Sequence, residues 1–306
     1  MLQLFFVALF AFAQAQQNDS DQLRALIKAL PQLPVERMDV KVNPPLTLEG
    51  ISAVTADQKG NIYVIHRPEN GGDPVVVLDP KGNFLRSWGK GMYKIPHGIR
   101  IDSAGNVWTL DANTSMVYKF TPDGKKLLEI SVGEVPDLTR DFCGATDIAF
   151  AKNGHVFVSD GYCNARVIEY DAAGKKIKQW GKKGTGPGEF NTVHSIAMGP
   201  DNNLYVADRE NGRLQKFDQS GKFLGEWKFG GQFYTVTFSQ KGELYAATHP
   251  KGVPLDNEFN VVKIDVSTGK LLGKFEVRSH ELGITPDGTL LPATRSGQLI
   301  FLRPRS

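Results

Sequence analysis

The composition of this 306-residue chain is that of a folded protein, because 41% of its residues are hydrophobic and can form a full core. The formal net charge of +3 is too small to indicate a nucleic-acid partner, and the lysines lie mostly in repeated turns rather than on one basic face. The 32 glycines and 17 prolines are spread along the chain, which favours many tight turns over a disordered segment.

The first seventeen residues, MLQLFFVALFAFAQAQQ, have the pattern of a secretory leader. A short apolar run, Leu4–Phe12, is followed by Ala13-Gln14-Ala15, which is typical of a cleavage site. The run is too short for a stable transmembrane span, and no other stretch is long and apolar enough. We therefore expect a signal peptide over residues 1–15 and a secreted or periplasmic protein without a membrane span.

The segment that follows, residues 16–37, holds apolar residues at helical spacing between Leu23 and Leu30. We expect a short helix there and assign it no function. Two extended segments, Met38–Val42 and Pro45–Leu48, come next, and we place the start of the main domain at residue 38.

A repeated unit fills the rest of the chain, with a period of roughly 40 to 50 residues. Each unit reads as four short strands separated by turns of the Asp-Gly or Gly-Asn kind, which supply the positive φ of tight hairpins. Four strands at this period are typical of a propeller blade. The sequence therefore predicts an all-β fold, a six-bladed β-propeller over residues 38–306. The units begin at Ser52, His97, Thr146, His194, Thr235 and His280.

The sixth unit is shorter than the others. After Gln298–Leu302 only four residues remain, so the outer strand of this unit is missing. A strand from Met38–Leu48 can supply it, which would close the ring and leave no exposed edge.

Three histidines occupy the same place in alternate units: His97, His194 and His280 each stand at the start of a first strand. The first strands line the central channel, and alternate blades lie about 120° apart around it. A single histidine at such a place is more often structural than a ligand, but three in register are hard to obtain by chance. Three imidazoles with one direction left open are the donor set of a catalytic zinc site.

Two cysteines, Cys143 and Cys163, follow the leader. In an oxidising compartment an even pair usually forms a disulfide, which we expect here. Two buried free thiols are the alternative.

Several segments are specific beyond the general repeat pattern: IPHGI from residue 95, DGYCN from residue 160 and ADRENGR from residue 207. In these segments the chain resembles the peptidyl-α-hydroxyglycine α-amidating lyase family, and its units resemble NHL repeats. The resemblance extends from about Leu48 to the end of the chain and is strongest in units two to four.

The resemblance implies a metal-binding axis. Family members bind zinc through three histidines that match His97, His194 and His280, and they hold a structural calcium on the same axis. The matching calcium donors are the backbone carbonyls of Val54 and Ile99 and the carboxylate of Glu281, where the family usually has Asp. The resemblance also implies the Cys143–Cys163 disulfide.

The catalytic residues implied by the resemblance are Tyr162, Arg67 and Arg209. A tyrosine beside two guanidinium groups can act as a phenolate base, and an arginine can pair with a substrate carboxylate. Without the resemblance, Tyr162 would be interpreted as a core aromatic residue, and the two arginines as members of salt bridges between blades.

The activity implied is the cleavage of a carbinolamide, a peptide that ends in α-hydroxyglycine, to a peptide amide and glyoxylate. We expect any hydroxylating monooxygenase to be a separate protein, and we expect a monomer. Two alternatives stay open, since the propeller fold hosts many functions. One is a metal-dependent, lactonase-like hydrolase, and the other is a non-catalytic binding propeller with a structural axial metal.

Overall fold

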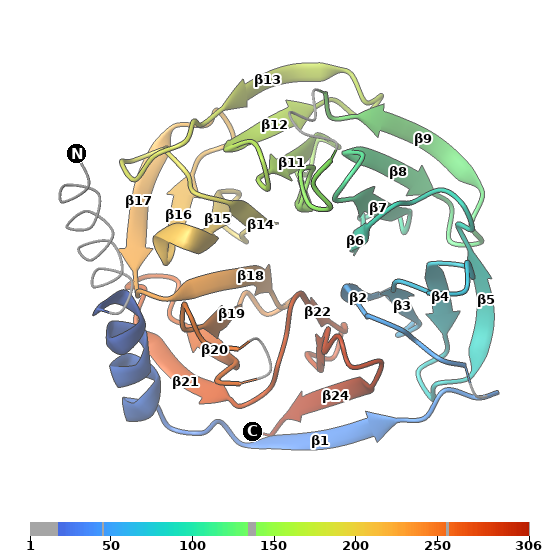
Figure 1. The fold of residues 1–306 in the computed structure, drawn as a ribbon, viewed down its shortest axis with the longest axis horizontal. Coiled ribbons are helices and arrows are strands. Elements are labelled where there is room, and N and C mark those ends of the chain that lie inside the picture. The colour runs from blue at the N-terminus through green and yellow to red at the C-terminus, as the bar shows by residue number, and fades with distance from the viewer. Residues whose placement is uncertain (1–17, 45, 134–138, 255–256, 306) are drawn as a thin grey trace.

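The computed structural model describes residues 18–44, 46–133, 139–254 and 257–305. Six four-stranded antiparallel sheets are arranged as blades around a central axis (Figure 1). The predicted all-β, six-bladed propeller is confirmed. The predicted signal peptide, residues 1–15, lies outside the described residues.

Each blade runs from an inner strand at the axis to an outer strand at the rim. Blade one consists of β2 (Ala53–Ala56), β3 (Ile62–Ile65), β4 (Val75–Leu78) and β5 (Phe84–Trp88). Blade two consists of β6 (Pro96–Ile101), β7 (Val107–Asp111), β8 (Met116–Phe120) and β9 (Lys126–Ser131). Blade three consists of β10 (Asp147–Phe150), β11 (Val156–Asp160), β12 (Arg166–Tyr170) and β13 (Lys176–Trp180). Blade four consists of β14 (Val193–Met198), β15 (Leu204–Asp208), β16 (Arg213–Phe217) and β17 (Phe223–Lys228). Blade five consists of β18 (Gln232–Phe238), β19 (Leu244–His249), β20 (Asn260–Ile264) and β21 (Leu271–Phe275). Blade six consists of β22 (Leu282–Ile284), β23 (Leu290–Pro292), β24 (Leu299–Pro304) and β1 (Val35–Val40). A short 3-10 helix, η1 (Arg209–Asn211), separates β15 from β16.

In blades one and two, the turn between the first two strands is built by an aspartate. In blade one, the Asp57 carboxylate accepts hydrogen bonds from the backbone amides of Lys59 and Asn61. Gly60 supplies the positive φ of 81° that this turn requires. The same arrangement recurs at Asp102 in blade two, so the turn motif fixes the strand spacing of the repeat.

The hydrophobic core lies between the blades and not in the channel. Six clusters of buried apolar side chains each join two neighbouring blades. One of them brings Trp108 of blade two, which is 2% exposed, together with Tyr170 of blade three. Since these faces are buried against each other, the angular position of every inner strand is set by packing on both sides.

The ring closes through the N-terminal segment. Strand β1 pairs antiparallel with β24, from Val35 opposite Pro304 to Val40 opposite Leu299. The strand therefore begins before residue 38, and Pro45–Leu48 adds no strand to blade six. None of the side chains of VERMDV is fully buried, so this outer strand has only a weak apolar pattern.

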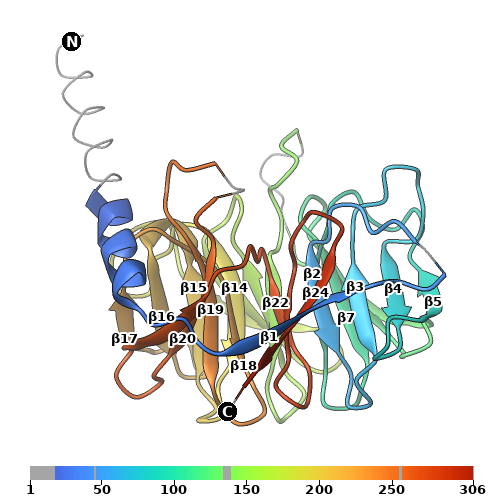
Figure 2. The same ribbon diagram turned by 90° about the horizontal axis from the view of Figure 1, so that it is seen from below.

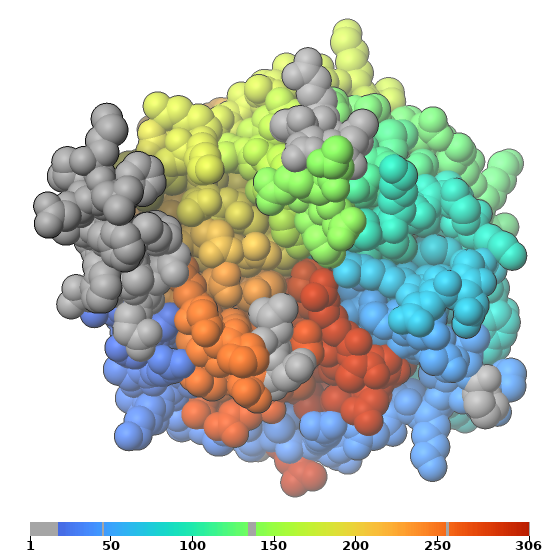
Figure 3. Space-filling model, viewed as in Figure 1, coloured from blue at the N-terminus to red at the C-terminus, as the bar shows by residue number. Residues whose placement is uncertain are grey.

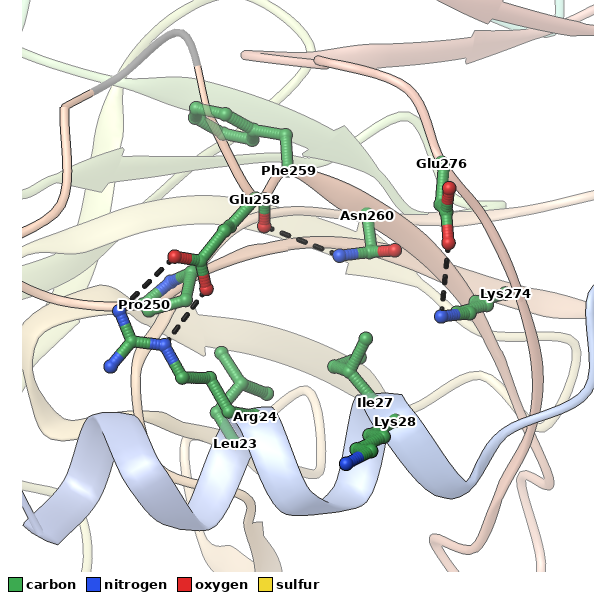
Figure 4. Close-up of a pocket in the computed structure, with 10 residues that line it drawn as sticks. All are labelled: Leu23, Arg24, Ile27, Lys28, Pro250, Glu258, Phe259, Asn260, Lys274 and Glu276. Atoms are coloured by element: carbon green, nitrogen blue, oxygen red, sulfur yellow. Dashed lines mark hydrogen bonds and ion pairs between the residues drawn. The ribbon is translucent and has the colours of Figure 1, made fainter.

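A helix over residues 18–29 precedes β1 and lies beside blades four and five (Figure 2). Its buried Leu23 packs into the cluster that joins these blades, and Arg24 forms an ion pair with Glu258 in which Nε and Oε2 are 2.8 Å apart. A surface pocket of about 410 Å³ lies between this helix and blade five (Figure 4). It contains none of the residues predicted to form the functional site. Among the described residues, no helix has the length and apolar character needed to cross a membrane.

Candidate metal centre and active site

Three buried histidines meet at the propeller axis. His97 lies in β6, His194 lies in β14, and His280 comes two residues before β22. One potential ligand atom from each imidazole lies within 4.8 Å of the others. The space-filling view shows atoms of the blades packed around the axis where the ribbon has an open centre (Figure 3). The inner strands of alternate blades therefore bring the three imidazoles together in a packed part of the channel.

Each of these histidines is oriented by the next blade. Nδ1 of His97 lies 2.8 Å from the carbonyl oxygen of Thr146 in blade three, and Nδ1 of His280 lies 3.2 Å from that of Ser52 in blade one. His194 contacts the Tyr234 carbonyl of blade five in the same way. A carbonyl can only accept, so Nδ1 carries the proton and Nε2 is left with its lone pair.

The electrostatic environment keeps these imidazoles neutral. Burial lowers the pKa of His97, His194 and His280 well below the ordinary value, and nearby arginines lower it further. A neutral imidazole is the form that binds a metal. The site thus presents three neutral nitrogen donors from three directions.

Tyr162 is placed against two of these donors. Its hydroxyl oxygen lies 2.8 Å from Nε2 of His97 and 3.0 Å from Nε2 of His194. One hydroxyl proton cannot satisfy both lone pairs when each Nδ1 already carries a proton. A cation bound to the Nε2 atoms would satisfy them, so the residues present fit a metal ion.

The loop that carries Tyr162 is held by neighbouring groups. Cys163 is joined to Cys143 by a disulfide, so the predicted bridge is confirmed. The Phe142 ring packs 5.2 Å from the Tyr162 ring, centroid to centroid. Gly161 lies against the carbonyl of Val193, where a Cβ atom would overlap the backbone. The DGYCN segment therefore contains glycine and cysteine at places where the loop needs close approach and a fixed position.

The ADRENGR segment positions Arg209 by a similar local structure. Asp208 accepts hydrogen bonds from Nε of Arg213 and from the side-chain amide of Asn211, at 2.8 Å each. Gly212, with φ of 60°, ends the 3-10 helix. The Arg209 guanidinium carbon then lies 5.6 Å from the centroid of the Tyr162 ring.

The two predicted arginines have different partners. Nε of Arg209 contacts Glu210 of the same blade at 2.8 Å, so this ion pair does not join blades. Nε of Arg67 donates to the Pro96 carbonyl at 3.2 Å, while its Nη2 is buried without a hydrogen-bond partner. In the part of the chain that the structure describes, no carboxylate forms an ion pair with Arg67. Burial lowers the pKa of Arg67 to about 10.

Arg295 is a further arginine of the site that was not predicted from the sequence. It has a positive φ of 60°, which is uncommon for a residue with a side chain. Burial raises the pKa of Tyr162, and the charges of Arg209, Arg295 and Arg67 oppose this effect. Arg67, Tyr162, Arg209 and Arg295 all follow the second strand of a blade. The matched position in the repeat is the signal that could have identified Arg295.

Two of the three expected calcium donors contact a guanidinium group. Nη2 of Arg100 lies 2.9 Å from Oε2 of Glu281, and its Nη1 lies 3.4 Å from the carbonyl oxygen of Ile99. Val54, the third expected donor, belongs to β2 on the same axis. Burial and the charge of Asp147 raise the pKa of Glu281 well above its usual range.

Comparisons with known proteins agree with the fold. A family model described as a 6-bladed beta-propeller matches residues 139–285. The probable peptidyl-alpha-hydroxyglycine alpha-amidating lyase of Caenorhabditis elegans is 29% identical over 283 residues, which cover 81% of this chain and 80% of that protein. Peptidyl-alpha-hydroxyglycine alpha-amidating lyase 2 of Drosophila melanogaster is 33% identical over 192 residues, which cover 54% of this chain and 46% of that protein. This chain belongs to the peptidyl-α-hydroxyglycine α-amidating lyase family.

Longer proteins also contain a region similar to this member of the amidating-lyase family. The peptidyl-glycine alpha-amidating monooxygenase of Mus musculus is 34% identical over 284 residues, which cover 78% of this chain and 29% of that protein. The chain thus spans about a third of the first curated relatives that it matches. Among solved structures, a catalytically inactive virginiamycin B lyase from Staphylococcus aureus superposes with a TM-score of 0.62 and 15% identity. It covers 89% of this chain and 100% of its own and shows a shared fold alone.

Proposed function

We propose that this protein is a zinc-dependent lyase that cleaves a peptidyl-α-hydroxyglycine, or a similar carbinolamide, to a peptide amide and glyoxylate. One observation carries the proposal: the Tyr162 hydroxyl lies within hydrogen-bond distance of two histidine Nε2 atoms. Among the described residues, no other group donates a hydrogen bond to these two nitrogens. Membership in the amidating-lyase family supports the same reaction.

The donor set favours zinc as the metal. Three neutral imidazole nitrogens with an open fourth direction suit zinc, whose bonds to histidine measure about 2.0–2.1 Å. The Tyr162 hydroxyl, which lies 2.8 Å and 3.0 Å from two of these nitrogens, would then be next to the ion. When bound, zinc would lower the pKa of the substrate hydroxyl and favour the ionised form of the tyrosine.

The side chains around the site account for the proton transfer. Tyr162, as the phenolate, takes the proton of the carbinol hydroxyl. The electron pair of that O–H bond forms the C=O bond of glyoxylate while the C–N bond breaks. The proton that Tyr162 took then passes to the leaving amide nitrogen, which regenerates the phenolate, so atoms and charges balance. In the metal-free chain, burial holds the Tyr162 pKa above its usual value, which makes the positive charges around the ring essential to this role.

The arginines account for binding the acidic end of the substrate. Arg67 has a buried Nη2 without a partner, and a carboxylate is the group that a guanidinium pairs with best. Arg209 lies over the Tyr162 ring and can contact the same carboxylate. The glyoxylate half of the substrate carries this carboxylate, so both arginines would hold it beside the tyrosine.

The decisive experiment measures glyoxylate released from a synthetic peptide that ends in α-hydroxyglycine. Activity should be lost after chelation and return with zinc. A protein that binds zinc, hydrolyses a lactone and releases no glyoxylate would support the hydrolase alternative instead. A protein without metal-dependent turnover of either substrate would support a binding propeller.

The compartment and partners form part of the same proposal. A secreted monomer with a cleaved leader over residues 1–15 agrees with the Cys143–Cys163 disulfide, which persists in oxidising compartments. The substrate would come from a separate enzyme that hydroxylates the terminal glycine. Mass spectrometry of the secreted protein and size-exclusion chromatography would test cleavage and the monomeric state.

A further inference from the structure

A second cation site lies next to the histidines, and an arginine of the chain fills it. Nη2 of Arg100 donates to Oδ2 of Asp147 at 2.8 Å and to Oε2 of Glu281 at 2.9 Å. The side chains of both carboxylates are only 1% exposed. One guanidinium therefore bridges two buried carboxylates that come from blades three and six.

Hydroxyl groups from blades four and five complete this layer. Ser195 of blade four donates to Asp147 at 2.6 Å, and Thr235 of blade five donates to Glu281 at 2.9 Å. The two hydroxyl oxygens lie 3.4 Å apart. Blades two to six thus contribute one residue each to a polar layer around the axis, and Arg100 is its only cation among the described residues that form these bonds.

The guanidinium contacts the donors that a calcium ion would need. Its hydrogen bonds reach Glu281 and, more weakly, the carbonyl of Ile99, which are two of the three expected ligands. Calcium requires six to eight oxygen ligands at about 2.3–2.6 Å. A guanidinium at hydrogen-bond distance from the same oxygens would repel a divalent cation at close range, and weak screening inside the protein strengthens that repulsion. The residues present therefore do not fit a calcium ion at this place.

We propose that Arg100 is the resident cation of the propeller channel and takes the place of a structural calcium ion. The guanidinium pairs with both Asp147 and Glu281 and fixes the carboxylate that follows His280. Arg100 is thus a positioning residue, and the histidine site needs no second metal beside it. This inference is independent of the reaction proposed for the site.

The test combines metal analysis with thermal unfolding of the purified full chain. Wild-type protein should contain less than about 0.1 calcium per chain after gel filtration, and its Tm should be the same in EGTA and in millimolar calcium. Arg100→Ala leaves two buried carboxylates unpaired, so its Tm in EGTA should fall by at least about 5 °C. Added calcium should restore part of this loss, because it can then use the freed oxygens.

Two further variants keep the test decisive. Arg37→Ala removes an exposed arginine of β1 that pairs with Asp39, and it should leave Tm unchanged in both buffers. Arg100→Lys keeps the positive charge, so its Tm should not change when calcium is added. This variant still tests the proposal if Arg100→Ala does not fold. The proposal is overturned if wild-type protein binds about one calcium per chain with a rise in Tm. It is also overturned if Arg100→Ala matches wild type in both buffers.

Discussion

Tyr162→Phe is the substitution that tests the proposed reaction most directly, because it removes a single oxygen atom. That oxygen lies 2.8 and 3.0 Å from Nε2 of His97 and His194. The ring contacts stay, including the edge-on contact with Phe142 at 5.2 Å between centroids. All three histidine nitrogens also stay, so the variant should retain its metal.

The expected loss of activity follows from the role of the hydroxyl. General acid–base catalysis contributes about 10²- to 10⁴-fold, and each factor of ten equals about 1.36 kcal/mol of activation free energy. We therefore expect kcat to fall by about 10² to 10⁴, or about 3 to 5 kcal/mol. The free energy of unfolding should change by only about 1 kcal/mol, the usual net value of one hydrogen bond.

The assay compares glyoxylate release, metal content and Tm for wild type, Tyr162→Phe and a matched control. Tyr118→Phe is the control, because its hydroxyl donates to the Met92 carbonyl at 3.3 Å and contacts no candidate ligand. It should retain wild-type activity. If Tyr162→Phe holds its metal and turns over substrate within a few-fold of wild type, the tyrosine does not transfer the proton.

Four further predictions concern metal, substrate, disulfide and pH. His280→Ala should lose zinc, measured by elemental analysis, because two imidazoles hold the ion poorly; retention of one zinc per chain would contradict the three-histidine site. Arg295→Met should raise KM for an acidic substrate by about tenfold, the cost of one charge-assisted contact, with an unchanged KM as the contrary result. Replacing Cys143 and Cys163 by Ala should lower the free energy of unfolding by about 3 kcal/mol, since the bridge closes a loop of 20 residues; a denaturant titration would show this loss or its absence. Metal-free protein should lose stability as pH falls below about 6.5. Histidines of the unfolded chain take up protons there, whereas burial lowers the pKa of the three histidines in the folded protein. A Tm independent of pH between 7.5 and 5.5 would oppose this reasoning.

The sequence predicted the features that repeat. Six blades and the convergence of His97, His194 and His280 follow from a fixed period, because equal spacing along the chain becomes equal angles around an axis. Tyr162, Arg67 and Arg209 share a place after the second strand of a blade, but the sequences of these loops do not indicate where the side chains point. Those residues were assigned by family resemblance, and the structure brings Tyr162 to the histidines and Arg209 over the tyrosine ring.

Arg100 shows why the remaining part of the site was not predictable. Its partners Asp147 and Glu281 lie 47 and 181 residues away in the sequence, so no local pattern links the three. A charged residue in a strand is normally interpreted as exposed. Here the inner strands of three blades enclose it, and only the closed ring reveals its partners.

The pairing of β1 with β24 makes the order of synthesis matter for the metal site. β1 precedes the other strands in the sequence, and its partner β24 follows them, so the first and last of these strands must meet to close the ring. The three histidines emerge in the order His97, His194, His280, and His280 belongs to the blade that β1 completes. A nascent or truncated chain that lacks blade six holds only two of the three imidazoles. Tight metal binding would therefore begin only once blade six has formed, and bound metal would mark a closed ring.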